Sequence, residues 1–342
     1  MKQEIIALNP ERNVTLTAYI QEVEGEFQFT KRPAILVLPG GGYAMCSDRE
    51  ADPVAMAYLR AGYQAFILRY STGKNKTWPN PLEDYEQAMA LIEERAEEWH
   101  LDSSRIAAVG FSAGGHLCAC AATIANHKPA AAILVYPAIL KDICDMCQPG
   151  MPQPNEHVTG ETSPCFLVAA RDDRTVDVKN SLMMQLALAE KGVPFESRIY
   201  SYGGHGFSTG EDWIINNSLS SRIPDWVDDS IGWLKETLGT LTMKGFSEPN
   251  IAVSKNGDNA PVLSVMCSLA HIRKQSADAI AVLKPLFAGM RAVADARGFS
   301  MEGLMAAVGN NTVRELMEMV QVDGETIQEI DKTLHSMINH IE

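Results

Sequence analysis

The chain has 342 residues, a hydrophobic content of 46% and a formal net charge of −14 at pH 7. This length is enough for one large α/β domain and a smaller unit, with a sizeable buried core. The acidic balance and the absence of any Lys/Arg cluster argue against nucleic acid and against a strongly anionic substrate, so a neutral substrate fits best.

No apolar run approaches the roughly 18 residues that a membrane span needs. The first residues, MKQEII, look like the start of a strand and not like a secretory leader. We therefore expect a cytoplasmic protein with no membrane partner. The seven cysteines are scattered as reduced thiols are, and the lone pair Cys144 and Cys147 lacks the second pair that a zinc site needs. We expect neither a metal nor a cofactor.

Up to about residue 240, short apolar runs alternate with amphipathic stretches. This pattern predicts a mostly parallel central sheet with helices on both faces. The first two runs alternate more strictly, which indicates an antiparallel edge. Strands are expected over 4–8, 14–20, 34–38, 64–70, 105–109, 131–136, 165–170 and 196–200, and helices over 52–61, 82–99, 113–126, 178–191 and 225–238.

Two stretches depart from this alternation. Residues 141–164 are rich in Pro and too long for a simple connector, so they are either a pocket-shaping loop or a disordered insertion. Residues 241–261 are polar and rich in Gly and Asn, as linkers are. The predicted domains are therefore 1–240, with the linker at 241–261, and an all-helical extension at 262–342. Its expected helices are 262–296 (interrupted at Pro285), 300–308, 312–320 and 325–341.

Ser112 stands at the centre of Gly110-Phe111-Ser112-Ala113-Gly114, between a predicted strand and a predicted helix. A serine at a sharp strand-to-helix turn, with glycine two residues before and after it, is typical of a nucleophile elbow. The small residues let the neighbouring backbones approach closely. Ser112 is thus the candidate nucleophile.

A serine nucleophile needs a base, and the base needs a carboxylate that orients it. The best base is His205, in a glycine-rich loop after the strand 196–200, whereas His116 on the elbow helix is expected to be a packed imidazole. The acid is Asp172 or Asp173, both directly after the strand 165–170. Asp173 is favoured because its spacing to Val176 gives an Asp-x-x-Val pattern, and Asp172 would then hold a turn through backbone N–H groups.

The loop Pro39-Gly40-Gly41-Gly42-Tyr43 follows another predicted strand. Its glycines allow main-chain amides to face a substrate, so Gly41 and Gly42, together with the N–H of Ala113, are the expected oxyanion donors. A phosphate cradle is the rival interpretation, but the sequence around the loop has neither of the usual nucleotide-binding patterns. Three loop aromatics, Tyr43, Trp78 and Trp213, are expected either to stack a sugar ring or to cover the edge of the core.

These blocks together resemble the acetyl xylan esterase-like branch of the α/β-hydrolases, near the bacterial esterases of the hormone-sensitive-lipase type. The resemblance covers residues 1–240 and rests on 38–43, 78–84, 110–117, 171–173, 179–181 and 203–206. It implies the α/β-hydrolase fold, with Ser112 as nucleophile, Asp173 as acid and His205 as base. Pro39 replaces the His of the lipase signature, and the helical extension lies outside the usual pattern.

The resemblance also implies hydrolysis of short acyl esters, often acetyl groups on sugars. We therefore expect a serine esterase that acts on a small-molecule or oligosaccharide ester, with possible self-association through the C-terminal helices. Two alternatives remain open from the sequence: a peptidase or amidase of the same fold, and a non-catalytic scaffold.

Overall fold

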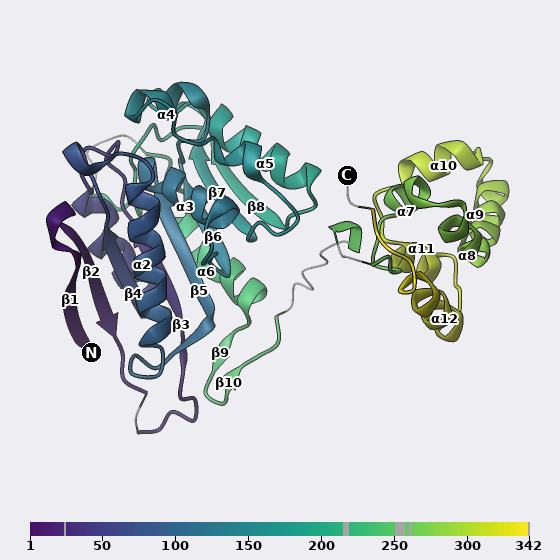
Figure 1. Ribbon diagram of the computed structural model, residues 1–342, viewed down its shortest axis with the longest axis horizontal. Helices are drawn as coiled ribbons and strands as arrows, with labels where there is room; N and C mark the ends of the chain where they lie inside the picture. The colour runs from purple at the N-terminus through teal and green to yellow at the C-terminus, as the bar shows by residue number, and fades with distance from the viewer. Residues whose placement is uncertain (24, 215–218, 250–256, 260–261, 341–342) are drawn as a thin grey trace. The chain divides into compact units, whose positions relative to one another are not determined.

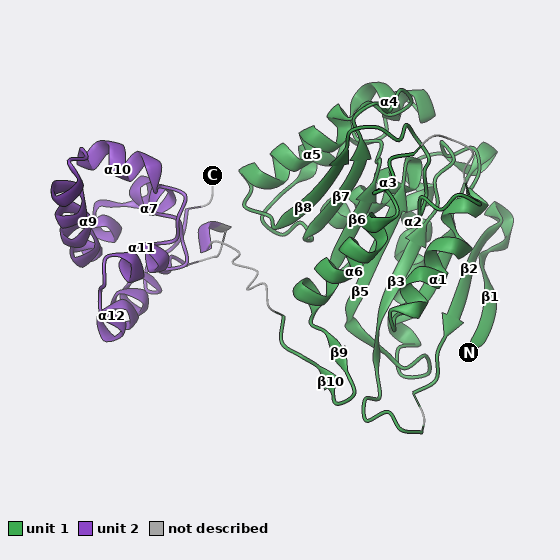
Figure 2. Cartoon of the chain, turned by 180° about the vertical axis from the view of Figure 1, so that it is seen from behind, with its two compact units in different colours: residues 1–252 green, residues 253–342 purple. Residues whose placement is uncertain are grey.

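The computed structural model describes residues 1–342 except 24, 215–218, 250–256, 260–261 and 341–342 (Figure 1). The chain divides into two compact units, Met1–Ala252 and Val253–Glu342 (Figure 2). Each unit has its own cluster or clusters of buried hydrophobic side chains.

The first unit contains an 8-stranded sheet in the order β1-β2-β4-β3-β5-β6-β7-β8 (Figure 1). β2 pairs antiparallel with both β1 and β4, and every pair from β4 to β8 is parallel. All the predicted strands and the antiparallel edge are confirmed. The strands are β1 (Lys2–Asn9), β2 (Val14–Ile20), β3 (Arg32–Leu38), β4 (Gln64–Arg69), β5 (Leu101–Phe111), β6 (Ala131–Val135), β7 (Cys165–Ala170) and β8 (Phe195–Tyr200).

Helices cover both faces of this sheet, as predicted. Side chains of α2, α3 and α5 share one buried cluster with one face, and those of α1 and α6 share a second cluster with the other. The central strands are buried on both faces, which explains their continuous apolar runs. The helices are α1 (Asp52–Arg60), α2 (Asn80–Glu94), α3 (Ala113–Ile124), α4 (Lys141–Cys147), α5 (Lys179–Glu190) and α6 (Asp225–Leu238).

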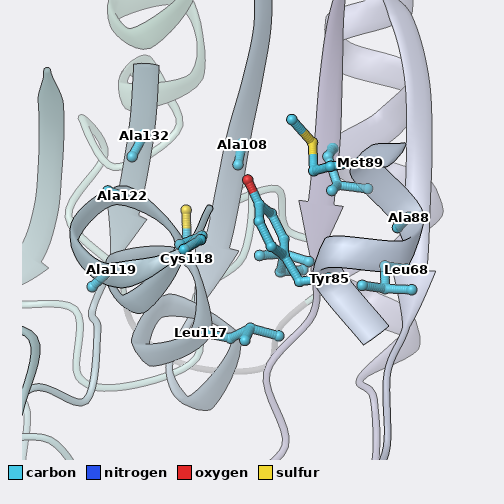
Figure 3. Close-up of a cluster of buried hydrophobic side chains, with 14 of the residues drawn as sticks. Leu68, Tyr85, Ala88, Met89, Ala108, Leu117, Cys118, Ala119, Ala122 and Ala132 are labelled. Carbon is cyan, nitrogen blue, oxygen red and sulfur yellow. The ribbon is translucent and has the colours of Figure 1, made fainter. Parts of the chain in front are cut away.

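The small residues of α3 let this helix lie close to the sheet. Figure 3 shows Cys118 and Ala122 facing Ala108 of β5 and Ala132 of β6, with Tyr85 of α2 beside them. Nearly all of α3 is buried. The N-terminus of α3, where Ser112 stands, is therefore held firmly against the carboxyl ends of the parallel strands.

For residues 141–164 the pocket-shaping interpretation is confirmed, because Ile143, Met146 and Cys147 line a pocket of the first unit, whereas the start of the expected linker is corrected. Residues 141–164 contain α4 and a 3-10 helix, η4 (Pro154–His157), so the stretch is an ordered part of the unit. The expected linker begins with a hairpin, β9 (Leu241–Thr242) and β10 (Gly245–Phe246). The Arg105 guanidinium lies over the Phe246 ring, 4.2 Å from its centroid, which attaches the hairpin to the first unit. The rest of the predicted linker includes residues outside the described ones.

The second unit is helical, as expected. Its helices are α7 (Leu269–Gln275), α8 (Ala277–Val282), α9 (Lys284–Arg297), α10 (Met301–Ala307), α11 (Val313–Met319) and α12 (Gly324–Leu334). The segment expected over 262–296 with an interruption at Pro285 is three helices. The interruption is confirmed, because Pro285 lies in the first turn of α9, and a second break, which was not expected, lies at Ser276, the N-cap of α8. Ser300 and Asp323 are the N-caps of α10 and α12.

Candidate active site

Ser112 lies in a strained turn between β5 and α3. Its φ of 51° and ψ of −114° are unusual for a residue with a side chain. The turn is possible because its flanking positions are glycines: a Cβ on Gly110 would lie 2.2 Å from the Gly114 carbonyl oxygen, and a Cβ on Gly114 would lie 2.1 Å from that of Leu38. The sequence therefore presents the Ser112 hydroxyl at the carboxyl edge of the sheet.

The loop after β8 brings His205 to Ser112. The Nε2 atom of His205 lies 2.9 Å from the Ser112 Oγ, and Nδ1 lies 2.6 Å from the Asp173 Oδ2. The Asp173 side chain is 1% exposed and accepts a hydrogen bond from Nδ1, so the proton resides on Nδ1 and Nε2 is left as the acceptor for the hydroxyl. The structure thus brings these three distant residues together in an order suited to proton transfer.

The two neighbouring carboxylates, Asp172 and Asp173, have different partners. The Oδ1 of Asp173 accepts from the N–H groups of Thr175 and Val176, at 2.8 and 2.9 Å, which fixes its other oxygen towards His205. The Oδ1 of Asp172 accepts from the N–H groups of Gly203 and Gly204, at 2.9 and 3.0 Å. These hydrogen bonds, that of Gly204 first, lower the pKa of Asp172. Asp172 therefore anchors the loop that holds His205.

The loop after β3 supplies backbone amides beside Ser112. Gly41 and Gly42 have φ values of 128° and 60°, and a Cβ on Gly41 would lie 2.3 Å from the Met45 carbonyl oxygen. Gly41, Gly42 and Ala113 line the same pocket as Ser112 and His205. Among the described residues, no hydrogen bond uses the N–H of any of these three as its donor. Three backbone N–H groups without an acceptor in the described part of the chain therefore belong to residues that line the pocket of Ser112.

The pocket around Ser112 has a volume of about 290 Å³. The polar residues that line it include Ser112, His205, Arg49 and Glu50. The apolar residues that line it include residues of α4. A small, partly apolar cavity beside a candidate nucleophile suits a short acyl group. The apolar lining consists of Met45, Ala138, Ile143, Met146, Cys147 and Val176.

None of the three aromatic residues expected at the mouth lines this pocket. Trp213 is 73% exposed but lines a separate cavity on the first unit, and Trp78 is half-buried with its ring edge-on to His116. For Tyr43 the structure favours the core alternative over stacking, because it is 1% exposed and packs against Tyr70. Its positive φ of 56° accompanies a side chain that lies in the core, which leaves no ring face for a sugar.

His116 is a packed imidazole, as expected from the sequence. Its Nε2 lies 2.8 Å from the Pro152 carbonyl oxygen, which can only accept, so this nitrogen carries the proton. The Tyr43 hydroxyl, 2.8 Å from Nδ1, is then the donor to His116. Burial lowers the pKa of His116 to about 4, which keeps the ring neutral at pH 7. The histidine thereby ties the glycine loop to the segment after α4.

Sequence reasoning missed Glu50 and Tyr136. Glu50 is 3% exposed, and it accepts from the Gly40 N–H at 2.8 Å and from the Tyr136 hydroxyl at 2.7 Å. The Tyr136 ring lies edge-on to His205, with centroids 4.8 Å apart. In the sequence, Glu50 resembles an ordinary acid just before a helix, and Tyr136 resembles the end of a strand. No local pattern distinguishes either residue.

The described part of the chain offers no group of three His, Cys, Asp or Glu side chains that could hold a metal ion. Cys144 and Cys147 are free, buried thiols. Within the same residues, no helix combines the length and the apolar character that crossing a bilayer demands.

Comparison with known proteins identifies the family. Residues 25–149 match the family model BD-FAE. The chain resembles the crystal structure of MGS-M1, an α/β hydrolase enzyme from a Medee basin deep-sea metagenome library, with 36% identity, a TM-score of 0.66, and coverage of 70% of this chain and 98% of that one. The chain therefore belongs to the α/β-hydrolase family, with a helical second unit added.

Two curated relatives match part of this chain. Endo-1,4-beta-xylanase B of Butyrivibrio fibrisolvens is 31% identical over an alignment of 215 residues, which covers 53% of this chain and 33% of the relative. Acetylxylan esterase of Xylanibacter ruminicola is 28% identical over an alignment of 216 residues, which covers 57% of this chain and 45% of the relative. The chain thus spans less than half the length of either relative.

Proposed function

We propose that the protein is a serine esterase that removes short acyl groups, acetyl above all, from a sugar or oligosaccharide. The observation that carries this proposal is the hydrogen-bonded series from Ser112 through His205 to Asp173, in a small pocket lined by the glycine loop. The names of the two curated relatives, a xylanase and an acetylxylan esterase, support a carbohydrate as the alcohol part of the substrate.

The first half of the reaction forms an acyl-enzyme. The Ser112 Oγ attacks the ester carbonyl carbon while His205 Nε2 takes the hydroxyl proton, and Asp173 stabilises the resulting imidazolium. The carbonyl oxygen becomes an oxyanion, which the N–H groups of Gly41, Gly42 and Ala113 stabilise. His205 then gives its proton to the sugar oxygen as the bond to the acyl carbon breaks.

The second half returns the enzyme to its starting state. Water attacks the acyl carbon while His205 takes a proton from the water. The same amide N–H groups stabilise the second oxyanion. Collapse of this intermediate releases the carboxylic acid and returns the proton to Ser112 Oγ. No cofactor is needed, because every proton is carried by His205.

The test compares substrates of different classes with one protein and its Ser112→Ala variant. We expect hydrolysis of p-nitrophenyl acetate and of acetylated xylo-oligosaccharides, falling as the acyl chain lengthens, and no turnover in the variant. Faster cleavage of aminoacyl amides than of acetyl esters would reassign the protein as a peptidase or amidase. Absence of turnover on every substrate, without labelling by an organophosphonate, would favour a scaffold.

A further inference from the structure

A third carboxylate, outside the proposed triad, lies in the wall of the active-site pocket. Glu50 ends the 3-10 helix η2 (Asp48–Glu50), and its side chain is buried between the glycine loop and Tyr136. Each of its oxygens has one donor: Oε2 accepts from the Gly40 N–H at 2.8 Å, and Oε1 accepts from the Tyr136 hydroxyl at 2.7 Å. A buried carboxylate with a donor at each oxygen costs far less than an unpaired one.

The first contact fixes the loop that holds the proposed oxyanion donors. Gly40 is so tightly enclosed that a Cβ there would lie 2.7 Å from the Glu50 Oε2, 2.7 Å from the Phe111 carbonyl oxygen and 3.1 Å from the Ser112 Cβ. The Gly40 N–H is directed to Glu50 and is therefore not available to a substrate. The next two residues, Gly41 and Gly42, line the pocket.

The second contact reaches the loop that holds His205. The Tyr136 hydroxyl donates to Glu50 and accepts from the Ser208 N–H at 2.9 Å. The Tyr136 ring packs edge-on against the rings of His205 and Phe207, with centroids 4.8 and 4.6 Å apart. The Ser208 hydroxyl also donates to the carbonyl oxygen of the residue before Glu50, at 2.5 Å. One carboxylate thus joins the two loops that flank Ser112.

We propose that Glu50 is a positioning residue for the esterase reaction: it orients the glycine loop through Gly40, orients His205 through Tyr136, and its negative charge favours the imidazolium that forms during acyl transfer. This inference rests on the proposed function. Preorganised supports of this kind hold reacting groups near their productive geometry. A negative charge close to an imidazole favours the protonated ring, in the same sense as the triad acid does.

The surroundings of Glu50 are consistent with a charged side chain. Burial raises the pKa of Glu50, while the hydrogen bonds from Tyr136 and Gly40 and the positive charge of Arg49 oppose that rise. Burial also raises the pKa of Tyr136, which keeps its hydroxyl proton available as a donor. The titratable and charged groups around the carboxylate are Cys46, Arg49, Tyr70, Tyr136 and His205.

Two substitutions test the negative charge of Glu50 and the length of its side chain separately. Glu50→Gln keeps the size but removes the charge and can no longer accept at both oxygens. We expect kcat for p-nitrophenyl acetate to fall about 10- to 100-fold, with KM changed little. In the profile of kcat/KM against pH, we expect the acid limb to move to lower pH by about half a unit or more. Glu50→Asp keeps the charge but shortens the side chain, which weakens its contacts with Gly40 and Tyr136. We therefore expect kcat to fall at least about tenfold while the acid limb stays near that of the wild type.

Asp48→Asn is the matched control, because Asp48 lies two residues away on the same 3-10 helix and its side chain is 84% exposed. We expect it to leave both the rate and the acid limb unchanged. Thermal unfolding of each variant checks that the fold is intact. The rate at which a fluorophosphonate labels Ser112 gives a second pH profile that needs no ester substrate.

Several results would overturn the inference. An intact Glu50→Gln protein with the wild-type kcat would do so, and so would a reduced kcat with an unmoved acid limb, which would mark Glu50 as merely structural. If Glu50→Gln does not fold, a Glu50→Asp protein with full kcat would overturn it. A wild-type protein that hydrolyses no ester refutes the proposed function instead, and the labelling profile then still tests Glu50.

Discussion

The hydrogen bonds of Asp173 make Asp173→Asn a sharp perturbation of the proposed triad. The oxygen of the introduced amide must remain on the N–H groups of Thr175 and Val176, because an amide NH₂ cannot accept from them. The NH₂ group therefore replaces the oxygen that faces His205 Nδ1. His205 then has to accept at Nδ1 and carry its proton on Nε2, where it can no longer take the proton of Ser112.

We expect kcat to fall by about 10³–10⁴-fold, or roughly 4–5.5 kcal/mol in the activation free energy, as expected when a triad histidine is held in the wrong tautomer. The free energy of unfolding should change by less than about 1 kcal/mol, since two of the three hydrogen bonds are kept and the third is reversed in direction. Initial rates on p-nitrophenyl acetate give the first quantity, and urea denaturation gives the second.

Asp172→Asn is the control for this experiment. The oxygen of the amide introduced at this position can still accept from Gly203 and Gly204, so kcat should stay within about threefold of the wild type. A large loss in Asp172→Asn with little loss in Asp173→Asn would refute the assignment of the acid. Equal, small losses in both would show that His205 does not depend on a carboxylate for its tautomer.

Two further predictions concern the elbow and its histidine. Gly114→Ala should lower the unfolding free energy by about 3 kcal/mol or more and abolish turnover, because its Cβ would lie 2.1 Å from a backbone oxygen of Leu38. The control is Gly232→Ala on α6, where a Cβ meets nothing within 4 Å, and this substitution should be neutral or slightly stabilising. An equal effect of the two in urea denaturation would contradict this. The pKa of His116 is lowered from 6.5 to about 4 in the folded state, so the unfolded chain binds the proton more tightly and stability is lost as pH falls from 6.5 towards 4. The loss should reach about 3 kcal/mol at pH 4 relative to His116→Gln, and parallel pH profiles of the two proteins would refute it.

The large elements of the first unit could be predicted because their signals are local. A strand buried on both faces must be continuously apolar, and a turn that admits no Cβ must be glycine, so the sheet and the position of Ser112 follow from short windows of sequence. The order of serine, acid and histidine along the chain then indicated which loops meet. The choice between Asp172 and Asp173 rested on one spacing, and their hydrogen bonds distinguish them.

The features that could not be predicted depend on contacts between distant segments. Glu50 contacts Gly40 and Tyr136 across the fold, and none of these contacts leaves a periodic pattern. The sequence left open whether Tyr43 stacks a sugar or covers the core, and only its contact with the distant His116 shows that its side chain lies in the core. The helix α4 has only 7 residues, too few for a clear amphipathic signal.

The central claim is that the Ser112 hydroxyl, with its proton accepted by His205, is the nucleophile. Intact-mass analysis after reaction with a fluorophosphonate, followed by peptide mapping, measures this directly. We predict a single adduct on Ser112 that forms in parallel with the loss of esterase activity, and none in Ser112→Ala. An adduct on another residue, or full esterase activity in Ser112→Ala, would contradict the claim.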